Sequence, residues 1–405
     1  MTEVNLGKNI LWTVLSRFGA QGIAVISNVL LARYLGSIGF GEYAFVSAVV
    51  LIGNALSTFG MDMVLIRKIS STQDYSDLPA ALVIQLLIAI VFIAGVFILS
   101  PSLPAGNSLQ IYIVSLIPLS FFTVFTIALR GAQFMGSFSF LHFSVAIFQM
   151  ISVFILFAFG GGVERLVILL LSTQFLGALL GFILCITQIK DFPRHWHVDW
   201  NRILLLLHSS TQMAVIGTLR LVYEKMAVTM LPMLTSVDVT GLFSVSARVL
   251  DASKLGHMSA LSVMFPEMAR ENSLRRNFSD QSKRNYILLL FAAILLSLVL
   301  FVFAEPIIHL LFGKEFEASV DALRILAWIV TPYFIVTYYS LAFVAIHIER
   351  PVLIALIASL LLLAILLIWW SPLYGLLGAA FAILCAEIFQ AVFLWLQWRY
   401  YALPK

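Results

Sequence analysis

Long apolar stretches alternate with short polar segments along the whole chain. A bilayer core about 30 Å thick needs roughly 20 apolar residues per helix, and each stretch reaches that length. They lie at residues 9–34, 41–66, 78–100, 108–129, 138–160, 164–189, 202–232, 239–268, 285–312, 318–347, 351–371 and 375–400. The pattern predicts an all-α membrane protein of about twelve transmembrane helices.

Composition supports this interpretation. Hydrophobic residues make up 61% of the 405 and charged residues 11%, against roughly 25% charged residues in a soluble domain. So few charges do not cover a water-facing surface. The first apolar stretch has no small-residue cleavage site, so we expect a retained span rather than a signal peptide.

The distribution of Lys and Arg predicts the orientation. If the N-terminus is cytoplasmic, sixteen of the 24 Lys and Arg lie on or toward that side, with Arg17 of the first span counted among them. Four lie on the other side, and the remaining four lie inside later spans. Loops rich in Lys and Arg stay in the cytoplasm. We therefore expect a multi-pass protein of the cytoplasmic membrane with both termini in the cytoplasm.

The two halves of the chain share a weak repeat. Gly41–Ser47 resembles Gly241–Ala247, and Ile183–Cys185 recurs as Ile383–Cys385, both at an offset of two hundred residues. Six spans on each side make this a parallel repeat, which places a cavity between two lobes. The predicted parts are an N-terminal six-helix lobe (1–190), a cytoplasmic linker (191–201) and a C-terminal six-helix lobe (202–405).

Charged side chains inside the spans are the candidate site. A charge at mid-membrane costs roughly 2.5 to 3.5 kcal/mol on insertion scales, so a cluster needs pairing or hydration. The cations are Arg17, Arg220, Lys225, Arg248 and Lys254, the anions are Glu224, Asp251 and Glu387, and Gln21 and Asn28 continue a polar stripe from Arg17.

Two interpretations of this cluster remain open. The pairs Arg220 with Glu224, Arg248 with Asp251 and Asp251 with Lys254 have helical spacing and can neutralise one another. Full pairing still leaves an excess of cations, which suits an anionic ligand. Arg and Lys bind phosphate especially well. The three carboxylates are also candidates for binding H⁺ or Na⁺ as a coupling ion.

Prolines in the spans predict where helices bend or end, and the lack of catalytic motifs bears on the class of function. Pro118, Pro232 and Pro332 in or near spans predict kinks or helix ends. The sequence has no phosphate-binding loop, nucleophile elbow, zinc pattern or dinucleotide fingerprint, and no basic run with interleaved aromatics that tracks nucleic acid. We expect a transporter that uses no cofactor, binds no nucleic acid and is not an enzyme.

One family has a similar pattern. Its marks here are Asn9, Trp12, Ser16, Arg17 and Gln21, then Leu31–Gly36, Phe40–Tyr43, Gly60–Asp62 and Arg67, and later Val239–Arg248, Phe265–Pro266, Leu311–Phe316 and Leu326–Ala327. These segments span most of the chain and resemble the polysaccharide transporter family, the oligosaccharide-lipid flippases of the superfamily that includes lipid II flippases and multidrug extruders.

The resemblance implies a fold and a substrate. It implies two six-helix lobes forming a V around a central cavity, and export of a polyprenyl-pyrophosphate-linked glycan from the cytoplasmic to the outer leaflet. By position, Arg17 is the first-span cavity arginine and Arg248 its counterpart in the eighth span. We expect both to contact the pyrophosphate.

The sequence departs from the family at Lys225, where an acidic residue is expected; the nearest acid is Glu224. This departure argues against transferring the family's ion-coupling role to this position.

Two other functions are compatible with a polytopic protein. One is a cation-coupled multidrug extruder of the same fold, although a site for organic cations should be acidic or aromatic. The other is a glycosyltransferase or polymerase that uses polyprenyl sugars, although no outer loop exceeds roughly fifteen residues, which is short for a catalytic loop.

Overall fold

The computed structural model describes residues 6–190, 192, 198–254, 280–346 and 348–402, with the side chains of 6–18, 280–283 and 402 left out of the description. Every regular element in these ranges is helical. Eight helical stretches among them are long and apolar enough to cross a membrane. The predicted all-α membrane fold is confirmed.

Two very long helices each supply two spans. Helices α1 (Leu6–Thr58) and α14 (Arg350–Ala402) contain 53 residues apiece, which at 1.5 Å per residue is about 80 Å, well over twice the bilayer core. Each is interrupted by a glycine with a positive φ, Gly36 at 67° and Gly375 at 57°. Only glycine adopts this conformation without steric cost, so these two residues mark the turns between successive spans.

The fourth and tenth spans are each broken into two helices, without a glycine of positive φ at the break. Helix α4 (Gly106–Ile113) gives way to α5 (Leu116–Gly131), and α12 (Ser319–Ala327) gives way to α13 (Val330–Ala345). Pro118 and Pro332 each occupy the third position of the second piece, where the missing N–H has no intrahelical partner to lose. The helix ends predicted from these prolines are confirmed, while Pro232 lies inside α8 near its end.

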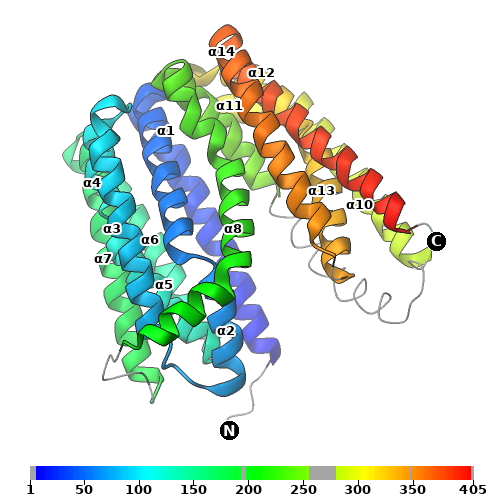
Figure 1. The fold of residues 1–405 in the computed structure, drawn as a ribbon. Coiled ribbons are helices and arrows are strands. Elements are labelled where there is room, and N and C mark those ends of the chain that lie inside the picture. Colours follow the sequence, from blue (N-terminus) through cyan, green and yellow to red (C-terminus); the bar gives the residue numbers. More distant parts are fainter. Residues whose placement is uncertain (1–5, 191, 193–197, 255–279, 347, 403–405) are drawn as a thin grey trace. The chain divides into compact units, whose positions relative to one another are not determined.

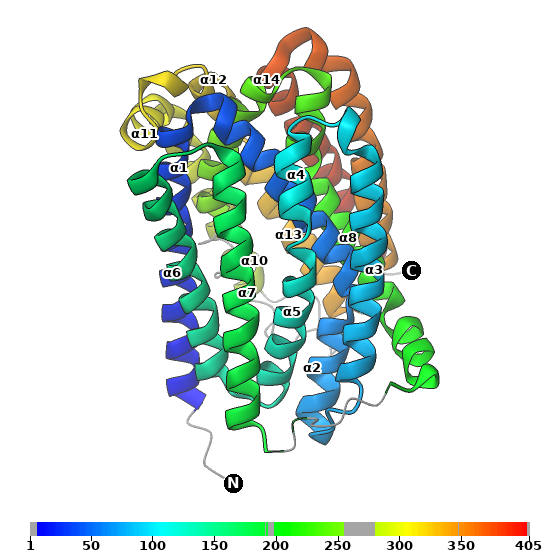
Figure 2. The same ribbon diagram turned by 90° about the vertical axis from the view of Figure 1, so that its left-hand side faces the viewer.

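One compact unit comprises Met1–Leu35 with Glu42–Lys225. Helix α5 packs against α2, α3 and α7, and α7 also packs against α4 and α6; Figure 2 shows these helices running side by side, with α4 and α5 in line. The remaining helices of this unit are α2 (Met61–Thr72), α3 (Leu78–Leu99), α6 (Met135–Phe159), α7 (Val163–Gln188) and the first part of α8 (Trp200–Leu234).

The other compact unit comprises Gly36–Gly41 with Met226–Lys405. Here α13 and α12 pack against α14, and α10 packs against α12 and α13; α10 (Asp280–Val302) is followed by the short α11 (Ala304–Leu311) (Figure 1). Gly41 and Gly241, which the repeat pairs, touch in this unit. A Cβ on Gly241 would lie 1.8 Å from the carbonyl oxygen of Ser37, so only glycine fits this approach.

Large apolar side chains point outward from the spans of both units. Val91 on α3 is 72% exposed and Leu373 on α14 is 73% exposed. Such exposure is costly in water but not in hydrocarbon. Contact with membrane lipid follows from it.

The sequence predicts two six-helix lobes joined by a cytoplasmic linker at residues 191–201. This division concerns the order of spans across the membrane, and it stays a prediction. Packing divides the chain elsewhere, since Trp200–Lys225 of α8 belong to the first compact unit and the helix passes into the second at Met226.

Candidate functional site

The predicted site residues lie on four helical segments. Arg17, Gln21 and Asn28 are on α1, Arg220, Glu224 and Lys225 on α8, Arg248, Asp251 and Lys254 on the helix that begins at residue 237, and Glu387 on α14. The side chain of Arg17 lies outside the described residues. The first six residues belong to the first compact unit and the last four to the second.

The polar stripe on α1 is partly described. Gln21 is exposed and Asn28 is half-buried. The Asn28 amide nitrogen donates to the carbonyl oxygen of Ala24 at 2.6 Å. Its Oδ1 is buried and accepts no hydrogen bond from the described residues.

On α8 one of the expected intrahelical pairs forms. Arg220 Nε lies 3.3 Å from Glu224 Oε1, with spacing i, i+4. Both side chains are more than two-fifths exposed, so the pair contributes little stability. Arg220 is therefore compensated in charge but remains accessible.

The helix carrying Arg248 starts where a serine caps it. The backbone N–H of Val239 donates to Ser236 Oγ at 3.2 Å, which satisfies one of the free N–H groups of the first turn. This start places Arg248 and Lys254 on neighbouring turns of one helix. Lys254 Nζ lies 3.8 Å from Asp251 Oδ1.

Lys254 also has an aromatic partner that the sequence did not suggest. Its ammonium lies 4.6 Å from the centre of the Tyr333 ring on α13, within the range of a cation–π interaction. Only packing of two distant segments brings them together, and the sole sequence signal nearby was Pro332. Lys254 is thus shared between a carboxylate and a ring.

Arg248 differs from the other described cations of the site. Its side chain is half-buried, and no described residue forms a hydrogen bond or an ion pair with it. The expected contact with Asp251 is not among the ion pairs of the described residues. In the predicted eighth span, a half-buried guanidinium is costly without an anion.

Glu387 is the buried carboxylate of the second unit. It is 5% exposed, as is Gln390 one turn later on α14. Residues at i and i+3 share a helix face, so an acid and an amide face the same interior. Its predicted ability to bind H⁺ or Na⁺ stays a prediction.

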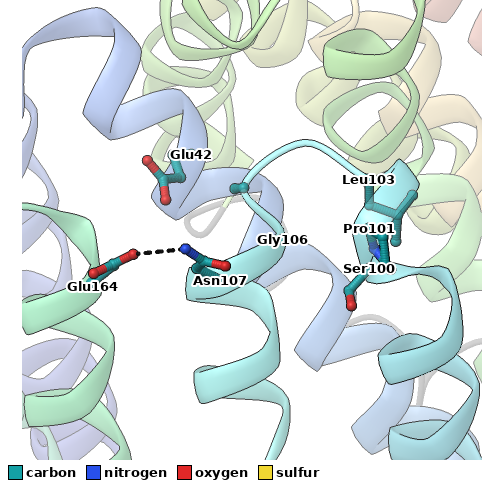
Figure 3. A pocket seen from close by; sticks show the side chains of 8 residues that line it. Glu42, Ser100, Pro101, Leu103, Gly106, Asn107 and Glu164 are labelled. Carbon is teal, nitrogen blue, oxygen red and sulfur yellow. Dashed lines mark hydrogen bonds between the residues drawn. The ribbon is translucent and has the colours of Figure 1, made fainter.

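A cavity of about 360 Å³ lies elsewhere, within the first unit. Figure 3 shows Glu42, Asn107 and Glu164 around it, beside the turn that joins α3 to α4. Asn107 donates to Glu164 at 3.4 Å, and Ser108 donates to Glu42. These carboxylates already accept hydrogen bonds, and none of the predicted site residues lines the cavity.

The described ranges contain no group of three or more His, Cys, Asp or Glu side chains able to hold a metal ion.

Comparison with known proteins identifies similar sequences and folds. The sequence model of a family described as "Polysaccharide biosynthesis protein" matches residues 6–272. No curated protein matches the chain.

Solved transporter structures share the fold. An inward-facing multidrug resistance MATE family transporter of the MOP superfamily is 13% identical, with a TM-score of 0.77 over 94% of each chain. The lipid II flippase MurJ in an inward closed conformation is 16% identical, with a TM-score of 0.78 over 96% of this chain and 87% of that one. A MOP superfamily transporter from Pyrococcus furiosus, described as having a binding pocket of reverse polarity, is 14% identical, with a TM-score of 0.67 over 98% and 95%.

Proposed function

This chain belongs to the polysaccharide biosynthesis protein family, and from that premise we propose that it is a flippase for a polyprenyl-pyrophosphate-linked oligosaccharide. It moves this lipid from the cytoplasmic to the outer leaflet of the cytoplasmic membrane by alternating access, with both of its own termini in the cytoplasm. The fold is that of MOP transporters, which supports transport by a change of conformation.

The observation that carries the proposal is the state of Arg248. A pyrophosphate brings more than one negative charge into a low-dielectric interior and must be compensated there. Arg248 is a half-buried cation with no hydrogen-bond or ion-pair partner among the described residues. Its guanidinium fork matches phosphate oxygens in a bidentate manner.

The other predicted residues have supporting roles in this proposal. Arg17 binds the same pyrophosphate, as the family resemblance implies. Arg220, Lys225 and Lys254 raise the local positive potential, which Glu224 and Asp251 reduce only in part. Gln21 and Asn28 offer hydrogen bonds to glycan hydroxyls, and the exposure of Gln21 supports this role.

Ion coupling is assigned to Glu387. A carboxylate that is 5% exposed in an apolar helix changes its protonation or binds a cation when its surroundings change. Either H⁺ or Na⁺ serves this purpose. Glu224 and Asp251 are more exposed and engaged in helical pairs, so they are weaker candidates.

A multidrug extruder of the same fold is the second candidate. The buried Glu387 and the resemblance to MATE transporters favour it. Its cargo is cationic and requires acidic or aromatic surroundings. The surplus of cations in the named spans favours an anionic cargo instead.

The experiment uses proteoliposomes that contain a fluorescent polyprenyl-pyrophosphate-linked oligosaccharide. A membrane-impermeant quencher reports how much of the lipid reaches the outer leaflet. We expect more to become quenchable than in protein-free vesicles. A parallel assay of organic-cation efflux separates the alternatives, and cation efflux without movement of the lipid-linked glycan would overturn the proposal.

A further inference from the structure

One ionic cluster of the first compact unit lies outside the candidate site. It consists of Lys68 on α2, Ser76 and Asp77 in the turn before α3, and Arg202 on α8, and we call it the Asp77 clamp. The turn and the start of α8 lie at the end of this unit where α2 ends (Figure 2). All four residues fall within Glu42–Lys225.

Asp77 uses both carboxylate oxygens, one for each neighbouring helix. Lys68 Nζ donates to Oδ2, and Arg202 Nη1 lies 3.3 Å from Oδ1. Arg202 Nη1 also donates to Ser76 Oγ. The Asp77 side chain is 14% exposed, against 41% for each cation. The carboxylate is thus the shielded centre of the clamp and joins α2, the start of α3 and α8.

Apolar packing continues the contact along α8. Ile203 and Leu206 belong to the same buried cluster as Leu78 and Leu82 of α3. Further along, Gly60 meets α8 so closely that a Cβ there would lie 2.5 Å from the backbone nitrogen of Ala214. Gly60 also has a φ of 62°, which glycine adopts most readily. The first half of α8 therefore rests on this unit from Arg202 to Ala214.

The same helix leads directly to predicted site residues. Arg220 follows Arg202 by eighteen residues, or about 27 Å of helix. The helix then enters the second compact unit at Met226. Arg220, Glu224 and Lys225 all precede this point, so their placement depends on what holds the first half of α8.

We propose that Asp77 is a positioning residue for transport: it holds the first half of α8 on the first compact unit and so fixes how α8 presents Arg220, Glu224 and Lys225. The role of these three residues rests on the proposed function, whereas the hold on α8 does not. Asp77 itself touches no cargo.

The first test measures, without any cargo, how firmly the first half of α8 is fixed to the first compact unit. Spin labels are placed at Leu204 on α8 and Met63 on α2, which are 66% and 60% exposed, after Cys185 and Cys385 are replaced by alanine. We expect a narrow distance distribution by pulsed electron resonance. Asp77→Asn should at least double its width.

The matched control is Asp74→Asn. Asp74 lies in the same turn, reaches Lys68 only at 3.8 Å and is 45% exposed. We expect its distance distribution to equal that of the unchanged protein. Equal distributions for Asp77→Asn and Asp74→Asn would overturn the proposal, and gel filtration of each variant verifies that it is folded.

The second test replaces the contacts of Arg202 with Ser76 and Asp77 by a covalent bridge between positions 76 and 202. Ser76→Cys with Arg202→Cys should lower glycan-lipid movement several-fold, and a short bifunctional thiol cross-linker should restore it. Failure of the cross-link to restore movement would show that the contact is not a fixed support. If the unchanged protein moves no glycan-lipid, the proposed function fails, while the spin-label distances still decide the role of Asp77.

Discussion

Two groups of charges, one in each compact unit, differ in how they are compensated. Around Asp77 every cation has an acidic partner, since Lys68 and Arg202 both reach its carboxylate. Along the helix at residues 248–254, Asp251 pairs with Lys254, and Arg248 has no such partner among the described residues.

The difference supports a structural role for the first group and the proposed binding role for the second. A carboxylate that contacts cations from two helices fixes those helices. Lys68 also lies 3.8 Å from Asp74, and Arg202 lies 3.9 Å from Asp199. This group therefore has no excess of positive charge to attract an anionic ligand. A half-buried arginine without an anion is costly until a ligand supplies one. Charge density alone does not distinguish the two groups; their pairing does.

Arg248→Ala should have the largest effect on transport. Loss of a charge-assisted, bidentate contact of about 2 to 3 kcal/mol corresponds to a reduction of roughly 30- to 150-fold. Movement of the glycan-lipid in proteoliposomes measures it. Arg248→Lys should retain part of the activity if a point charge suffices. Full activity of the Arg248→Ala variant would show that the pyrophosphate binds at another position.

Glu387→Gln should remove the dependence of transport on an ion gradient. The amide keeps the shape of the side chain but neither loses a proton nor attracts a cation with full charge. We expect a reduction of at least about tenfold under a gradient, equal to about 1.4 kcal/mol, and little change without one. Gradient dependence that survives in this variant would assign coupling to another group.

Substitution of Tyr333 tests how Lys254 is held. Tyr333→Leu removes the ring beneath the ammonium and should reduce transport about two- to fivefold, as expected for a cation–π contact of about 0.5 to 1 kcal/mol. Tyr333→Phe keeps the ring and serves as the control. Equal losses in both variants would show that the hydroxyl, and not the ring face, matters.

Asp74→Asn should have the smallest effect of these variants. The expected effect is a small loss of stability that depends on pH. Hydrogen bonds from Ser76 hold the pKa of the Asp74 carboxyl below its ordinary value, with Lys68 adding to the effect and burial opposing it. A lowered pKa stabilises the folded state at neutral pH, and this contribution is lost as the pH falls through the folded-state pKa.

The measurement for Asp74 is thermal unfolding in detergent. At neutral pH we expect the variant to lose no more than about 0.5 kcal/mol, because the group is exposed. The difference from the unchanged protein should disappear in acid. A difference that grows with acidification would contradict the assignment.

Much of the fold followed from local pattern. The spans, the breaks near Pro118 and Pro332 and the membrane environment were predicted because hydropathy and the geometry of proline act over a few residues. Gln21 and Asn28 were placed on one helix correctly for the same reason. The pairs Arg220 with Glu224 and Asp251 with Lys254 were also foreseeable, since helical spacing alone brings them together.

Contacts between distant segments were decided only by the tertiary structure. Arg202 meets Asp77 across 125 residues and Lys254 meets Tyr333 across 79, and no local period encodes either pair. The place where α8 passes from one compact unit to the other was equally hidden, because it depends on which neighbours bury each turn. By itself the sequence determined which stretches are apolar enough to cross a membrane, and it predicted that cations exceed anions in the spans that carry the site. Packing decided which of the described charges are compensated.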